Sequence, residues 1–141
     1  MERKLTKKDE IVTSVNNVAI RNNLAYLPYT DDLFTGKLES YKKNSLDRIA
    51  HGGYRNGKKI GQWEYYNKNG ILEIRSFYKN GKKDGTYLKF FEDGQLEEKV
   101  TFRNGKKDGL FEQYLNDGAI IEKGKYKEGD KEGIHLSFHS G

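Results

Sequence analysis

A glycine pattern that repeats every 24 residues is the feature that most constrains how this chain folds. Four short segments begin and end with glycine, at 57–61, 81–85, 105–109 and 129–133. A third glycine follows in the same register at Gly70, Gly94 and Gly118. A strict period of this length is typical of arrays in which each repeat is one small supersecondary unit that packs mainly against its neighbours.

Ring-bearing residues keep the register of the glycines. Two residues after the second glycine of each unit stand Trp63, Tyr87, Phe111 and His135. Five residues after it stand Tyr66, Phe90, Tyr114 and Phe138, and eight residues after the third glycine stand Tyr78, Phe102 and Tyr126. An earlier, degenerate unit is found when Gly36 is aligned with Gly61. This unit has Ser45 where later units have the turn glycine.

Each unit contains two runs rich in aromatic and branched residues, bounded by glycines, which is the pattern of a β-hairpin. Asn80-Gly81 and Asn104-Gly105 at one edge favour positive backbone torsions in tight turns. We expect the same torsions at the opposite edge, in Asn69-Gly70, Asp93-Gly94 and Asp117-Gly118. The sequence therefore predicts an all-β fold, an elongated twisted single antiparallel sheet built of repeated 24-residue β-hairpins.

The repeats divide the chain into a short N-terminal part and an array. Residues 1–32 are expected to form a polar N-terminal segment and a capping hairpin, with two short strands around Asn22-Asn23 and with the charged residues Met1 to about Glu10 frayed. The repeat units are predicted at about 33–56, 57–80, 81–104 and 105–128, with a partial unit at 129–141.

Composition limits the functional classes that are open to the chain. The 141 residues suit one domain, and a net charge of +5 permits nucleic acid binding without giving a strong signal for it. The chain has no cysteine, which excludes disulfides, thiolate nucleophiles and cysteine-ligated zinc. Because the first residues are polar, we expect a cytoplasmic protein from the sequence as given, or an exported or periplasmic one if a leader precedes it.

The repeated motif Tyr-x-Asn-Gly-Lys-Lys-x-Gly-x-Trp-x-x-Tyr, at Tyr54 to Tyr66 and echoed in the next two units, resembles bacterial MORN repeats of the variant type. The layout from about Asp31 to Gly141, including Leu33-Phe34-Thr35-Gly36-Lys37, resembles the bacterial YwqK-family antitoxins. This resemblance implies a twisted elongated sheet, no catalysis, and an antitoxin or immunity role beside a partner toxin. MORN arrays of eukaryotes are also linked to phospholipids and to plant phosphatidylinositol phosphate kinases, whose catalytic part this chain lacks.

The Gly-Lys-Lys turns are the first candidate site. The repeat predicts that one edge of the sheet carries Lys58, Lys59, Lys82, Lys83, Lys106 and Lys107, with Lys131 in the last turn. Such a row suits the phosphates of anionic lipids. Asp84, Asp108, Asp130 and Glu132 stand in the same turns, and lysine at sheet edges also serves ordinary solubility, so a purely solvated edge is the competing interpretation.

The second candidate site is a partner-binding strip on one face of the sheet. It contains the column Trp63, Tyr87, Phe111 and His135, and the residues two positions further along, which are Tyr65, Lys89, Gln113 and Ser137. Side chains two residues apart share a face of a strand. Aromatic anchors carry much of the energy of protein interfaces, although the same rings also serve as the fold's own stacked ladder.

Signals for catalysis, metal or cofactor are weak. The Gly-Lys-Lys-Asp-Gly turns lack the spacing of a phosphate-binding loop, and we expect no cofactor. In an extended strand His135 and His139 would lie about 13 Å apart, too far to share a metal ion. Recurrent carboxylates, Glu73, Glu97, Glu98 and Glu122, are explained better by a solvated face than by acid–base chemistry.

Three functional hypotheses remain from the sequence. The leading one is a non-enzymatic protein-binding module of the antitoxin or immunity type. The alternatives are an exported envelope or surface module that contacts host proteins, and a peripheral binder of anionic phospholipid. The strand near Ile134 to Phe138 lacks a return strand in this sequence, which favours either a homodimer through that edge or a longer native chain.

Overall fold

The computed structural model describes residues 12–13, 18–41 and 47–138. Thirteen strands and no helix occur among these residues. The charged segment from Met1 to about Glu10, which the sequence predicts to be frayed, lies outside the described residues, and so do Ser45 and His139.

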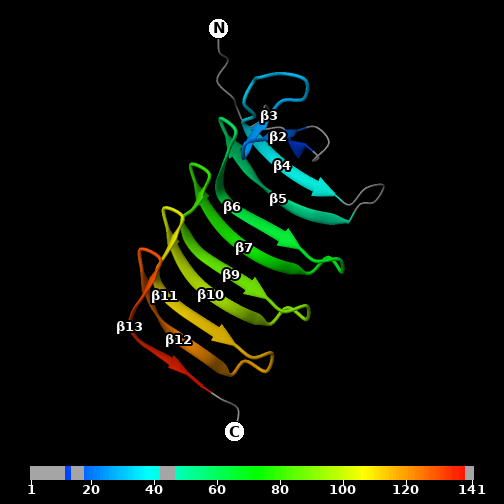
Figure 1. The fold of residues 1–141 in the computed structure, drawn as a ribbon. Helices are drawn as coiled ribbons and strands as arrows, with labels where there is room; N and C mark the ends of the chain where they lie inside the picture. Colours follow the sequence, from blue (N-terminus) through cyan, green and yellow to red (C-terminus); the bar gives the residue numbers. More distant parts are fainter. Residues whose placement is uncertain (1–11, 14–17, 42–46, 139–141) are drawn as a thin grey trace.

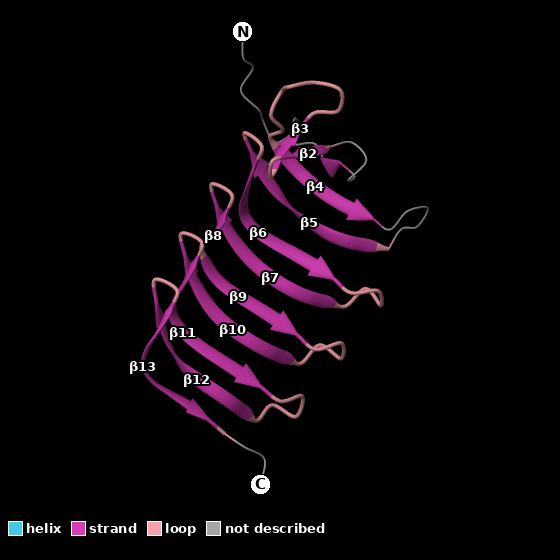
Figure 2. Cartoon of the chain, viewed as in Figure 1, coloured by secondary structure: helices cyan, strands magenta, loops and turns pink. Residues whose placement is uncertain are grey.

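The thirteen strands are β1 (Val12–Thr13), β2 (Ala19–Arg21), β3 (Leu24–Tyr26), β4 (Gly36–Tyr41), β5 (Arg48–Arg55), β6 (Lys58–Tyr66), β7 (Leu72–Lys79), β8 (Lys82–Lys83), β9 (Gly85–Phe90), β10 (Leu96–Arg103), β11 (Lys106–Tyr114), β12 (Ile120–Lys127) and β13 (Asp130–Ser137). Figure 1 shows successive hairpins stacked side by side along the chain, from β4 at one end to β13 at the other. Figure 2 shows that loops alternate between the two edges of the resulting sheet.

Strands β4 to β13 follow one another in the sheet in chain order, and β8 pairs with β7 beside β9. The predicted all-β hairpin array is thus confirmed. Every pair within the array is antiparallel, but β1 joins β4 in parallel, which the hairpin pattern did not predict. Strands β2 and β3 form a separate two-stranded sheet around Asn22 and Asn23, which both have positive φ.

The two edges of the array use different turns. At the Gly-Lys-Lys edge both central residues have positive φ, as at Asn80 (50°) and Gly81 (82°), which is the tight turn the Asn-Gly pairs predict. At the opposite edge the prediction was wrong for the residue before glycine. Gly70 has a φ of 76°, whereas Asn69 is not among the residues with positive φ. The loop is longer there because the Asn67 side chain accepts hydrogen bonds from the Asn69 and Ile71 amides and closes a wider turn.

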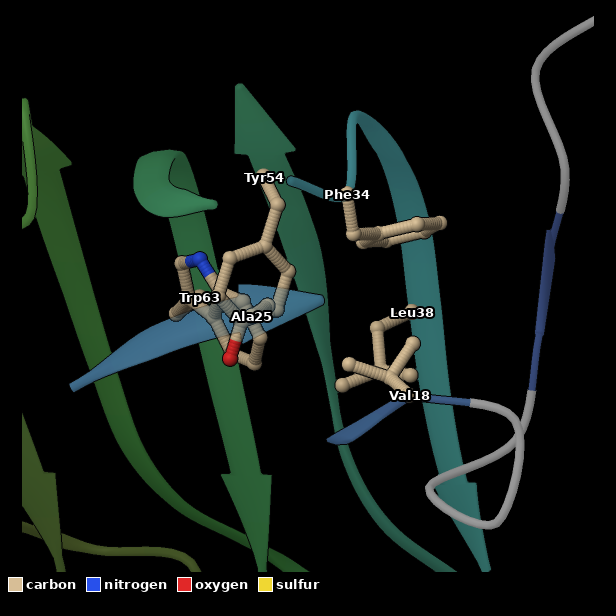
Figure 3. Packing of buried hydrophobic residues seen from close by; sticks show 6 residues of the cluster. All are labelled: Val18, Ala25, Phe34, Leu38, Tyr54 and Trp63. Carbon is tan, nitrogen blue, oxygen red and sulfur yellow. The ribbon is translucent and has the colours of Figure 1, made fainter. Parts of the chain in front are cut away.

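The main hydrophobic cluster lies where the β2–β3 hairpin meets the start of the array, and it comprises Val18, Ala25, Phe34, Leu38, Tyr54 and Trp63. Figure 3 shows the small hairpin crossing the array strands, with Ala25 against Tyr54 and Trp63. The hairpin is fixed at the turn by hydrogen bonds from the Ala25 amide to the Gly57 carbonyl (2.8 Å) and from the Phe34 amide to the Ala25 carbonyl (2.8 Å). We call this region the capped end.

Candidate functional site

One face of the sheet, which we call the ring face, alternates large and small side chains from strand to strand. The register places Trp63 opposite Ser76, Tyr87 opposite Val100, and Phe111 opposite both Val100 and Gly124. Small residues are needed because each ring lies over its neighbour. A Cβ added to Gly52 would lie 2.1 Å from the Trp63 ring, and one added to Gly124 would lie 2.5 Å from the His135 ring.

A second row of rings comes from the return strands and meets the first row edge to face. Tyr54 contacts Trp63 with ring centroids 5.1 Å apart, and Phe111 contacts Tyr126 at 5.5 Å. Tyr87 and Phe102 form the equivalent pair at 5.8 Å. The sequence pattern found the spacing of these return-strand rings but assigned them no part in the site. Edge-to-face pairs add about 0.5 to 1.5 kcal/mol each beyond simple burial.

The structure separates the six turn lysines into two groups, which corrects the expectation of a single lysine edge. The second lysine of each turn folds over the ring face. Lys59 Nζ lies 4.7 Å from the Trp63 ring centroid, Lys83 Nζ 4.9 Å from that of Tyr87, and Lys107 Nζ 5.0 Å from that of Tyr126. Only the first lysine of each turn, Lys58, Lys82 and Lys106, is exposed at the edge. The sequence pattern predicts where these lysines stand in the chain but not the direction in which their side chains point. That direction follows from cation–π attraction to the rings.

The acidic residues of the same turns link one repeat to the next. The Asp84 carboxylate accepts a hydrogen bond from the Asn104 amide, and the Asp108 carboxylate accepts one from the Glu128 amide, both at 3.4 Å. The Thr35 hydroxyl likewise accepts a hydrogen bond from the Asn56 amide, at 2.8 Å. The two carboxylate contacts lie one repeat apart, so the turn carboxylates have a structural use that the sequence did not reveal.

The burial of Trp63 limits its use in binding. Its side chain lies within the capped end, it is 2% exposed, and its indole donates a hydrogen bond to the Gly53 carbonyl at 3.0 Å. Tyr65 stacks against Trp63 on the same face. Neither ring of this first pair is fully open, because Val18, Ala25 and the Lys59 side chain pack beside them.

Beyond the capped end the ring face stays open. We call its half-buried residues the open strip, which consists of Tyr87, Lys89, Phe102, Gln113 and Tyr126. Phe111 lies in the middle of this region and is 6% exposed, because neighbouring rings and Lys107 cover it. The pKa of Tyr87 is raised, first by burial and then by nearby carboxylates such as that of Glu98, so its hydroxyl remains a neutral hydrogen-bonding group near neutral pH.

His135 ends the ring column on β13. Its Nε2 lies 2.8 Å from the Lys125 carbonyl and its Nδ1 lies 3.2 Å from Glu122 Oε1. Both partners are acceptors, so a protonated ring is needed to donate to both. The hydrogen bond from His135, followed by the nearby Lys131 ammonium, lowers the pKa of Glu122.

The opposite face, which we call the charged face, carries a column of paired charges that the sequence reasoning missed. Glu64 accepts from Arg75 at 3.0 Å and lies 3.1 Å from His51. Lys99 stands opposite Glu112, which stands opposite Lys123. Cross-strand pairs of opposite charge stabilise a sheet by about 0.2 to 1 kcal/mol each. The basic residues at equal repeat positions, Arg75, Lys99 and Lys123, were the signal available for this column.

No group of three or more histidine and acidic side chains suited to a metal ion occurs among residues 12–13, 18–41 and 47–138. The same described residues include no helix with the length and hydropathy that crossing a membrane requires.

Two adjacent segments of the array match a known family. Residues 59–80 and 83–104 match the family model described as MORN repeat variant. Each segment spans one hairpin of the array together with the lysine that folds onto its rings. Repeats of this family generally mediate interactions with proteins or membrane lipids and do not catalyse reactions. No curated protein sequence matches the chain. The matched hairpins are therefore similar to MORN repeats of the variant type.

Proposed function

We propose that this chain is a non-enzymatic protein-binding module of the antitoxin or immunity type, and that its open strip binds and neutralises a partner toxin. The observation that carries the proposal is that the N-terminal hairpin packs on Trp63 at one end, whereas Tyr87, at the equivalent position one repeat further along, is half-buried. At the capped end Ala25 and Val18 pack with Trp63 and Leu38. This packing of the chain's own hairpin supports the proposal that the same face accepts an apolar segment of a partner.

The chemistry of the open strip suits a protein partner. Half-buried tyrosine rings offer contact area with little loss of conformational entropy, and Lys89 and Gln113 add polar groups beside them. Within the described chain Lys89 has an acidic neighbour, Glu97, at 3.9 Å. The strip thus presents paired charges and rings, which favours recognition by shape and hydrogen bonding over attraction of a highly charged ligand.

The test is a capture experiment with two matched variants. Lys89→Glu changes the ring face, and Lys99→Glu makes the same charge change one strand away on the charged face. We expect the intact chain and Lys99→Glu to retain the same partner from lysate, and Lys89→Glu to lose at least tenfold in affinity. The captured protein should arrest growth when expressed alone and stop doing so when the chain is coexpressed. Equal retention by both variants, or a partner without toxicity, would contradict the proposal.

A second candidate function, binding to anionic phospholipid, is favoured by the exposed lysines. Lys58, Lys79, Lys82 and Arg103 line one hollow at the Gly-Lys-Lys edge. Asp84 lies in the same hollow and offsets part of the charge. Vesicles containing phosphatidylserine should bind the chain at low salt and release it at high salt, and a Lys58→Gln, Lys82→Gln variant should not bind. No vesicle binding at low salt would remove this candidate.

The other alternative is an exported module that contacts envelope or host proteins through the same open strip. It is separated from the antitoxin proposal by the identity of the captured protein, because an envelope protein without toxic activity would support it.

A further inference from the structure

The outer edge of β13 is the most unusual surface of the array. In residues 12–13, 18–41 and 47–138 no strand pairs with that edge, although every equivalent edge earlier in the array is filled. Unpaired edges in stable proteins are commonly protected by charge or by a bulge. The first half of β13 carries such charges, at Asp130, Lys131 and Glu132, but its second half carries exposed apolar residues, with Ile134 82% and Leu136 46% exposed.

These apolar residues gather with a neighbour on the charged face. Leu110 on β11 is 58% exposed and lines one hollow together with Lys125, Ile134 and Leu136. Phe138 follows the strand and is 47% exposed. Contiguous exposed apolar residues at an open backbone edge mark an interaction surface better than either feature does alone.

The repeats show what kind of strand such an edge accepts. On β6, Gly61 pairs with Tyr78 and Trp63 pairs with Ser76. On β11, Gly109 pairs with Tyr126 and Phe111 pairs with Gly124. The incoming strand therefore runs antiparallel, sets a small residue opposite the ring and sets a ring opposite the glycine. On β13 the corresponding residues are His135 and Gly133, which has a φ of 67° close to that of Gly61 at 66°.

Strand β13 itself meets this requirement. It reads Gly133-Ile134-His135, a small residue followed two positions later by a ring. When Ile134 stands opposite Ile134 of a second copy, Gly133 of each chain faces His135 of the other. In this register Lys131 faces Ser137, and Glu132 faces Leu136, so no like charges stand opposite one another.

We infer that two copies of this chain associate through antiparallel pairing of their β13 strands, centred on Ile134, to form one continuous sheet with twofold symmetry. The pairing satisfies the open backbone edge, continues the large-and-small alternation of the ring face, and brings the Ile134 and Leu136 side chains of both copies together. Such a self-complementary contact closes on itself and stops at a dimer.

The oligomeric state of the full chain tests the association. Sedimentation equilibrium should give a dimer, and Ile134→Lys should raise its dissociation constant at least tenfold, because two lysines would then face each other across the axis. Ile134 is exposed in the single chain, so the variant should fold as the parent does, which circular dichroism checks. Ile49→Lys, on an exposed apolar residue of β5, is the matched control and should leave the dimer intact.

The register is tested by disulfide cross-linking of introduced cysteines. Because the sequence has no cysteine, each variant contains a single thiol. Under mild oxidation Ile134→Cys should form a disulfide-linked dimer, because directly opposed residues are within reach of each other. Leu136→Cys should not, because its two copies would lie about 13 Å apart along the strands. A monomer at all concentrations, or a dimer that Ile134→Lys leaves unchanged, would overturn the association. Cross-linking through position 136 and not 134 would overturn the register.

Discussion

The two ends of the array bury similar rings by different means. At the capped end Trp63 is 2% exposed. The β2–β3 hairpin, Tyr54 and the Lys59 side chain pack around it. Near the other end Phe111 is 6% exposed although no hairpin covers it, because Tyr126, His135 and Lys107 lie around its ring. The repeat thus supplies most of the burial of these two rings, and the hairpin adds a cover over Trp63.

This comparison distinguishes the residues that stabilise the fold from the residues that are available for binding. Trp63, which packs under the hairpin, serves the fold, whereas Tyr87 at the same repeat position further along remains half-buried and available. A single-layer sheet has no second layer to protect it, so its rings must be covered by other side chains, by a cap or by a partner.

The difference between the two ends is tested most directly by removing the Trp63 ring at the capped end. Trp63→Ala should lower the free energy of unfolding by about 3 to 5 kcal/mol, because a large buried side chain is lost and a cavity remains. Tyr87→Ala, at the equivalent open position, should cost clearly less. Urea unfolding of both variants measures this difference. Equal losses would show that the hairpin adds nothing to the packing of Trp63.

The turn glycines sharpen the comparison at the edge of the sheet. Gly57 and Gly81 have similar φ values, 78° and 82°, so valine strains both by about 1 to 3 kcal/mol. Only at Gly57 would the new Cβ also approach Leu33 at 2.7 Å and the Ala25 carbonyl at 2.9 Å. Gly57→Val should therefore lower the thermal unfolding temperature more than Gly81→Val does. An unchanged unfolding temperature for Gly81→Val would show that its torsion is not required.

The small residues beneath the rings give a third test. Gly52→Ala should cost about 1 to 3 kcal/mol, because the added methyl group meets a Trp63 ring that is held between neighbours. Gly124→Ala should cost less, since His135 lies on the edge strand β13 and can shift. Chemical denaturation compares the two, and Gly53→Ala, whose Cβ would have its nearest contact at 3.6 Å, is the control. A larger loss at Gly124 would refute the rigidity of the capped end.

The lysines over the rings are expected to contribute a smaller amount. Lys83→Met keeps the aliphatic stem but removes the charge over Tyr87 and Phe102, and should lower the free energy of unfolding by about 0.5 to 1 kcal/mol. Lys82→Met, at the exposed neighbouring position, should stay within about 0.5 kcal/mol of the parent. Both are measured by urea unfolding. If the two variants behave alike, the ring contact of Lys83 has no energetic weight.

The smallest expected effect is the pH dependence at the open end. The lowered pKa of Glu122 in the folded chain means that its carboxylate stabilises the fold above the unfolded pKa of about 4.3, and that this contribution is lost as the pH falls through the folded pKa. The stability difference between the parent and Glu122→Gln should therefore be present at about pH 6 and be lost as the pH falls through the folded pKa. A difference that persists in acid would assign it to packing and not to charge.

Much of the array follows from local chemistry that a sequence displays. The Asn-Gly pairs specify the tight turns because both residues tolerate positive φ, and the 24-residue spacing specifies which rings share a column. At Asn69-Gly70 the same reasoning failed, because the Asn67 side chain satisfies two amides of the loop and makes a wider turn. A dipeptide signal does not include side-chain hydrogen bonds from residues outside it.

The candidate site was accessible to sequence reasoning only in outline. Periodicity identified Tyr87, Lys89 and Gln113 as residues to consider, but it treated Trp63 as their equal. The placement of the N-terminal hairpin on Trp63 is a long-range contact, and the direction of Lys59, Lys83 and Lys107 depends on rings from neighbouring strands. Neither is encoded in a local pattern.

The sequence by itself determined the repeat, the hairpins and the columns of rings, because turn torsions and strand alternation depend on residues close together in the chain. Only the tertiary structure decided which rings are covered, which lysines remain at the edge, and that Asp84 and Asp108 link successive turns. Identical positions in a repeat acquire different roles when their neighbours differ, and those neighbours are set by packing between segments that lie far apart in the sequence.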